Sequence, residues 1–164
     1  MTPADCAQIA CVGIALAGTG FSAITDLKKH KIRNAVTWPM ICIGLLSTGV
    51  FYPGALPGRF LFMIACVCMS LIGVLGAGDA KLIMAVCALL GPTIAMLTTV
   101  AAGVLFFAAA MIHSKQTGKR AWLGVRMTLT GCIDHAKTRE ETGRPFAPWM
   151  FAGLVLVLVA LWIF

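Results

Sequence analysis

The stretch GAGDAK at residues 76–81 sets an acidic and a basic side chain between two long apolar runs. The runs have the character of membrane spans, and a carboxylate in a membrane is costly unless it is compensated, so Asp79 is a candidate functional residue. A second carboxylate, Asp26, ends the first apolar run just before a basic cluster. The function therefore depends on whether Asp26 and Asp79 come together.

The composition is that of an integral membrane protein. Of the 164 residues, 60% are hydrophobic and 12% are charged, whereas roughly 25% are charged in an average soluble domain. The chain has the length of one domain, so we expect residues 1–164 to form a single membrane-embedded unit.

Six apolar segments predict an all-α fold, a polytopic bundle of about six transmembrane helices. Most segments approach the roughly 20 residues that a helix needs to cross about 30 Å of hydrocarbon. The fourth is shorter, because about a dozen residues span roughly 18 Å before Gly91 and Pro92 interrupt the helix. A short fourth helix would leave Asp79 in a recess that water can reach. The predicted spans are residues 6–25, 34–51, 60–75, 79–90, 93–112 and 148–164.

The basic residues predict the orientation of the bundle. Cytoplasmic loops are enriched in Lys and Arg, and with six spans only Arg59 of the 13 Lys and Arg residues falls on the other side. The first, third and fifth loops are thus predicted to be cytoplasmic, with both termini outside. The net charge of +7 also favours anionic lipid headgroups, and nothing beyond its sign indicates nucleic-acid binding. The cytoplasmic set is Lys28, Lys29, Lys31, Arg33, Lys81, Lys115, Lys119, Arg120, Arg126, Lys137, Arg139 and Arg144.

The fifth loop, residues 114–147, has a helical periodicity of its own. Its apolar positions recur at helical spacing, while most of its charged residues fall elsewhere, which predicts an amphipathic helix in the cytoplasmic interface. A solvated connector packed on the bundle is the alternative. The apolar positions are Trp122, Val125, Leu129, Cys132 and Ile133.

Counting the spans brings both aspartates to the cytoplasmic face. If their carboxylates lie within about 5 Å in a partly dry site, they share one proton. Such a pair can activate water and protonate a leaving amine, which is the chemistry of aspartic proteolysis. Each aspartate also has a structural interpretation. Asp79 could cap the N-terminus of its helix, and Asp26 could be an interface carboxylate beside Lys28 and Lys29, although a negative charge near a helix C-terminus opposes the macrodipole.

These residues resemble the type IV prepilin peptidases, membrane aspartic proteases of the GxGD class. GAGDAKL at residues 76–82 matches the GxGDxKL signature. DLKKHKIRN at residues 26–34 resembles the first-aspartate segment D-x-x-x-x-x-I-P-N, with Arg33 in place of the usual proline. RPFAP at residues 144–148 is similar to the Pro-aromatic start of the last span. The chain lacks the cysteine-rich domain of bifunctional members, so it resembles the short form found with Flp/Tad pili.

The resemblance implies an aspartic endopeptidase that removes the basic leader of a prepilin or pseudopilin at the cytoplasmic face of the bacterial inner membrane. Asp26 and Asp79 would be the catalytic dyad, with no metal or organic cofactor. The seven cysteines form no CxxC pair, so a structural zinc site is not expected either. The supporting motif residues are Gly76, Gly78, Lys81 and Asn34.

The supporting residues also have purely structural interpretations. Gly76 and Gly78 let the backbone bend and a substrate strand approach closely, or they serve helix packing through small residues. Lys81 is two residues from Asp79 and therefore on another helix face, where we expect it to contact a headgroup or a loop carboxylate.

Two other functional classes fit a small bundle of this kind. A proton-coupled transporter or channel subunit would use the two aspartates as a relay, although a relay should carry ionisable groups nearer the midplane. A scaffold subunit of an export machine is the other class, and it leaves the cost of Asp26 unexplained.

Overall fold

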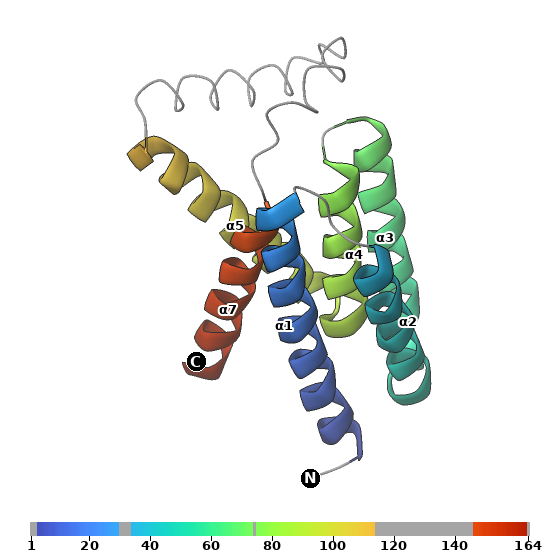
Figure 1. The fold of residues 1–164 in the computed structure, drawn as a ribbon. Coiled ribbons are helices and arrows are strands. Elements are labelled where there is room, and N and C mark those ends of the chain that lie inside the picture. Colours follow the sequence, from blue (N-terminus) through green and yellow to red (C-terminus); the bar gives the residue numbers. More distant parts are fainter. Residues whose placement is uncertain (1–2, 30–33, 74, 114–145, 164) are drawn as a thin grey trace.

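The computed structural model describes residues 3–29, 34–73, 75–113 and 146–163, and within these ranges the regular structure is entirely helical (Figure 1). This confirms the predicted all-α fold. The predicted interfacial helix of the fifth loop falls in residues 114–145, which lie outside the described ranges. Lys31 and Arg33 of the first loop also lie outside them. The elements are α1 (Pro3–Lys29), α2 (Asn34–Phe51), η1 (Pro53–Ala55), α3 (Leu56–Leu71), α4 (Ala77–Leu90), α5 (Pro92–His113) and α7 (Ala147–Ile163).

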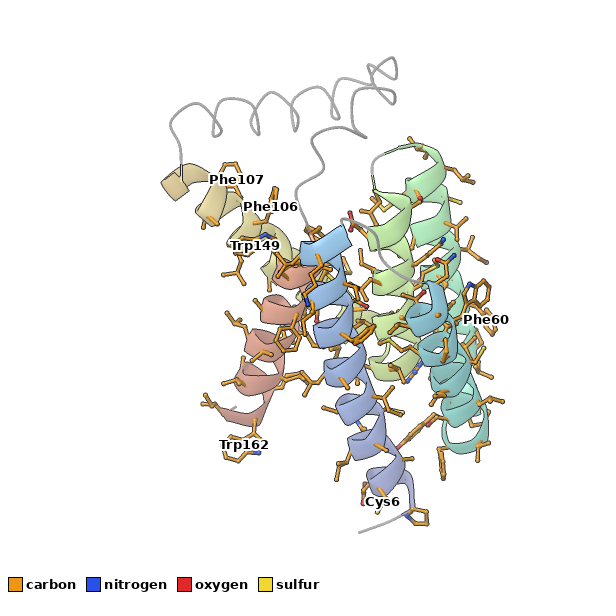
Figure 2. All side chains as sticks on the ribbon, in the orientation of Figure 1. Cys6, Phe60, Phe106, Phe107, Trp149 and Trp162 are labelled. Carbon is orange, nitrogen blue, oxygen red and sulfur yellow. The ribbon has the colours of Figure 1, made fainter. Side chains whose placement is uncertain are left out.

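The helices have the length and surface of a membrane bundle. Among the described residues, α1, α2, α5 and the combined η1–α3 segment are long and apolar enough to cross a membrane. The other two are shorter, with 14 residues in α4 and 17 in α7. Large apolar side chains cover the outer surface, where lipid rather than water is the favourable solvent. Examples are Leu61, 71% exposed, and Trp162, 90% exposed, which Figure 2 labels at the end of α7.

The predicted boundaries of the third span were wrong by one turn at each end. The expected span was residues 60–75, whereas α3 covers Leu56–Leu71. A proline in its first turn starts the helix early, because its fixed φ suits that position and it needs no amide partner there. Gly73 ends the turn that follows with φ of +81°, a left-handed conformation that favours glycine.

The short helix α4 is the centre of the bundle. It packs against α1, α2, α3 and α5, and Leu82, Val86 and Cys87 are fully buried. Fourteen residues give a helix of about 21 Å, which confirms the predicted short fourth helix. Its close contact with α2 depends on Gly44, since a Cβ built there would lie 2.4 Å from the carbonyl carbon of Ala88.

The helix α7 packs on α1 and α5. Its contact with α5 is also close, because a Cβ built on Gly153 would lie 2.9 Å from the backbone nitrogen of Ala102. Nearer the start of α7, the ring of Phe106 makes edge-to-face contacts with Phe146 and Trp149, each at a centroid distance of 6.2 Å. Figure 2 shows Phe106 and Trp149 where the two helices meet.

The chain direction gives the bundle two distinct ends (Figure 1). One end holds the last turn of α1 and the first turns of α2, α4 and α7, and we call it the aspartate end. The opposite end holds the first turn of α3 and the last turn of α4, and we call it the Arg59 end. The beginning of α1 and the end of α7 lie on the same side of the bundle, as an even number of crossings requires.

Candidate active site

Asp26 lies in the last two turns of α1 and is buried, with 6% of its surface exposed. The backbone amide of Ala147 donates a hydrogen bond to its Oδ2 atom at 3.1 Å. Ala147 is the first residue of α7, where backbone amides have no intrahelical partner and are available to a carboxylate. Asp26 is thus enclosed between helices. The catalytic role and the interface carboxylate beside Lys28 and Lys29 both stay predictions.

This contact changes the electrostatic description of Asp26. The sequence shows only that Asp26 is near the C-terminus of its own helix, where the macrodipole opposes a negative charge. The carboxylate also lies at the N-terminus of α7, whose partial positive charge attracts it. The attraction of the carboxylate to the N-terminus of α7 thus offsets its repulsion by the C-terminus of α1.

Asp79 occupies the third position of α4, and the residue before the helix is Gly76. The interpretation of Asp79 as the N-cap is wrong, because Gly76 takes that position with extended φ of −62° and ψ of 139°. The Asp79 carboxyl folds back over this glycine, since a Cβ built on Gly76 would lie 2.8 Å from its Oδ2 atom. A side chain at residue 76 would displace the carboxyl. Gly78 lies between them in the first turn of α4.

Lys81 and Asn34, two of the four supporting residues, contact each other. The Nζ atom of Lys81 donates a hydrogen bond of 3.0 Å to the Oδ1 atom of Asn34, at the exposed surface of the aspartate end. Among the described residues Lys81 thus contacts an amide oxygen, and the expected headgroup or loop-carboxylate contact stays a prediction, since the fifth loop lies outside the described ranges. Asn34 begins α2, so this bond joins the first turns of α2 and α4.

The structure brings the predicted site residues to one end of the bundle. Asp26 belongs to α1 and Asp79 to α4, and these helices pack directly against each other. Asp26 is buried while Asp79 is partly exposed, so one carboxyl is enclosed and the other is open to solvent. The Ala147 amide was missed by sequence reasoning. The available signal was its position just after the Pro-Phe pair, at the start of the predicted last span, because the first amides of a helix have no intrahelical partner.

Metal-ligating side chains do not gather in the part of the chain that the structure describes. No group of three or more His, Cys, Asp or Glu residues within it is arranged to hold an ion.

The helices and the two carboxyls define a polytopic helical membrane protein with a candidate acidic site at one end. A family model described as type IV leader peptidase matches residues 12–112, which is more than half of the 164 residues. The chain therefore belongs to the type IV leader peptidase family, a family of peptidases with prepilin-type substrates. Searches of curated proteins and of solved structures found no match. The matched segment contains Asp26, Asp79 and all four supporting residues but ends before α7.

Proposed function

We propose that this protein is an aspartic endopeptidase that cleaves the leader of Flp/Tad-like prepilins at the cytoplasmic face of the bacterial inner membrane. One observation carries the proposal. Asp26, enclosed between α1 and the start of α7, lies at the same end of the bundle as Asp79, which opens the adjacent helix α4.

In the proposed reaction, Asp26 and Asp79 hold one proton between them. The ionised carboxylate takes a proton from a water molecule, whose oxygen attacks the scissile carbonyl carbon. The protonated carboxyl donates its proton to the carbonyl oxygen, giving a tetrahedral diol. Collapse of the diol breaks the C–N bond: one diol hydroxyl returns its proton to the carboxylate that had protonated the carbonyl oxygen, and the other carboxyl passes the proton taken from water to the leaving amine. The dyad returns to its singly protonated state without a covalent intermediate.

The position of the dyad suits a substrate that is part membrane helix and part soluble leader. The proposed prepilin keeps its apolar helix in lipid beside the exposed surface of the bundle. Its basic leader would lie at the aspartate end, near anionic headgroups. Because α4 is about 21 Å long, its first turn can lie below the membrane surface, where the scissile bond emerges.

The orientation is supported by the basic residues. Lys28 and Lys81 lie at the aspartate end, while Arg59 lies in the first turn of α3 at the opposite end. This distribution favours a cytoplasmic aspartate end.

The test is cleavage of a tagged prepilin in liposomes by the wild type and by Asp26→Asn and Asp79→Asn. Both variants keep the side-chain volume and are expected to lose at least about 1000-fold in kcat, because neither can exchange a proton at that position. Asp5→Asn is the matched control, since Asp5 lies on the same helix α1 as Asp26 but in its first turn. Cleavage by either dyad variant at the wild-type rate would refute the proposal.

The substrate class is tested in the same assay. Replacing the leader lysines and arginines of the prepilin with glutamine should raise KM more than it lowers kcat, since those charges act in binding. An unchanged KM for the glutamine-substituted prepilin would contradict the proposed recognition of the basic leader.

A further inference from the structure

Ser22 has a buried hydroxyl group without a hydrogen-bond partner in the described structure. The residue is 1% exposed, and its Oγ atom is unpaired among the described residues. Serine and threonine in a helix usually satisfy the hydroxyl by donating to a carbonyl three or four residues earlier. Thr19 does so on the same helix, donating to the carbonyl of Ala15 at 2.7 Å. The unpaired state of Ser22 therefore calls for its own explanation.

Ser22 precedes Asp26 by four residues, so the two side chains are neighbours on one face of α1. Both are buried. Side chains on a helix lean toward its N-terminus, which directs the Asp26 carboxyl toward the turn that carries Ser22. The Ala147 amide occupies Oδ2 of Asp26, and a carboxylate has acceptor sites for further donors on its other oxygen.

We propose that Ser22 is a positioning residue of the active site, whose hydroxyl donates a hydrogen bond to the Asp26 carboxyl, through a side-chain rotation or one buried water. This inference rests on the proposed function. With the Ala147 amide on one oxygen and the Ser22 hydroxyl on the other, the carboxyl keeps a single orientation while its proton is gained and lost. Ser22 itself does not contact the reacting bond.

The competing explanation is that Ser22 is simply an unsatisfied hydroxyl in a packed helix. The chain offers a matched case in Thr98 on α5, which is fully buried and whose Oγ1 atom is likewise unpaired within the described residues. Thr98 lies where α5 meets Gly153 of α7 and is not on the helix of either aspartate. Removing an unsatisfied buried hydroxyl is neutral or stabilising when no partner is lost.

The experiment compares full-length wild type, Ser22→Ala and Thr98→Val in liposomes, with kcat, KM, the pH profile of kcat and the thermal unfolding midpoint as readouts. Ser22→Ala should lower kcat about tenfold, shift the pH profile, leave KM at its wild-type value and lower the unfolding midpoint slightly, because the Asp26 carboxyl loses a donor. Thr98→Val should leave all four unchanged or raise the midpoint. A Ser22→Ala enzyme with wild-type kcat and pH profile would overturn the proposal, as would equal losses in Thr98→Val.

An infrared measurement separates this proposal from the proposed function. The carboxyl stretch of Asp26 is assigned from the difference spectrum between the wild type and Asp26→Asn. Loss of a hydrogen-bond donor in Ser22→Ala should move this band to higher frequency, whereas Thr98→Val should not move it. An unmoved band overturns the role of Ser22. A moved band in a protein that cleaves no prepilin keeps the Ser22 contact and refutes only the peptidase assignment.

Discussion

The two ends of α4 are built in opposite ways. At the Arg59 end, the guanidinium of Arg59 donates a hydrogen bond to the backbone carbonyl of Ala88, and Gly44 of α2 lies against the same residue. At the aspartate end, the glycine that precedes α4, Gly76, leaves space for the Asp79 carboxyl. Contacts of Arg59 and of the α2 backbone hold the Arg59 end of α4, whereas Asp79 at the aspartate end is partly exposed.

This difference indicates how a short central helix can carry a reactive group. The last carbonyls of a helix lack intrahelical partners, and a cation that binds one of them also opposes the negative end of the dipole. With α4 fixed at its far end, Asp79 in its first turn stays partly exposed, as the proposed contact with a substrate requires. We therefore expect substitutions at the aspartate end to change activity more than stability, and those at the Arg59 end to do the reverse.

After the two aspartate substitutions, the largest effect is expected from Gly76→Ala at the aspartate end. The new methyl group would lie 2.8 Å from Oδ2 of Asp79, so the carboxyl must swing away. Because the φ and ψ of Gly76 are allowed for alanine, the fold should persist while kcat falls about 100-fold, as expected for a misplaced catalytic group. Prepilin cleavage and thermal unfolding are measured together. Gly58→Ala is the control, since nothing lies within 4 Å of its Cβ position. Full activity in Gly76→Ala would contradict the proposed catalytic role of Asp79.

The next effect is expected from Gly44→Ala, on stability instead of catalysis. Its methyl group would lie 2.4 Å from the Ala88 carbonyl carbon, and backbone cannot yield as a flexible side chain does. We expect a loss of about 1–3 kcal/mol, or roughly 2–12 °C in the unfolding midpoint in detergent. Gly49→Ala on the same helix is the control, because its nearest contact is an ordinary 3.9 Å. Equal midpoints for the two variants would show that the α2–α4 contact does not hold the bundle.

The sequence predicts the helices well, because hydropathy and helix-breaking residues are local properties. The α2 segment was predicted at its observed bounds, and Gly91 ends α4 with φ of +94°, as the Gly-Pro pair indicated. The third span was misplaced because the apolar residues from Ile72 to Leu75 continue the hydropathy signal through a turn. The helix ends earlier than the hydropathy indicates, because Gly73 adopts a left-handed conformation just after it.

The site is less predictable, because its contacts join distant parts of the chain. Asp26 and Ala147 are 121 residues apart, and Lys81 and Asn34 are 47 apart. The sequence indicates that these residues share a membrane face, but helix packing decides which of them touch. Asp26 is enclosed in part by the start of α7. The residues around Asp26 in the sequence do not indicate that this helix packs there.

A smaller effect is expected from Arg59→Met, which tests the Arg59 end. The substitution removes the donor to the Ala88 carbonyl and keeps most of the apolar stem. We expect about 1 kcal/mol of lost stability, because a hydrogen bond from a charged group is partly offset by relief of its desolvation. Cleavage per folded enzyme should stay at the wild-type rate. Arg59→Lys, which retains the charge, should have an unfolding midpoint between those of the wild type and Arg59→Met. A drop in kcat without a change in midpoint would reverse the assignment of the two ends.

The smallest effect is expected for the Lys81–Asn34 contact, which lies at the aspartate end but at its surface. A double-mutant cycle of Lys81→Met, Asn34→Ala and the combined variant isolates the pair from the other contacts of each residue. Because water competes for both groups, we expect a coupling energy of about 0.5 kcal/mol in thermal unfolding. Lys28→Met is the control for loss of a surface charge at this end, since Lys28 is also exposed. If the bond aligns the first turns of α2 and α4 for catalysis, the cycle should couple more strongly in kcat than in stability. Coupling in stability with none in kcat would mean that the bond serves only the fold.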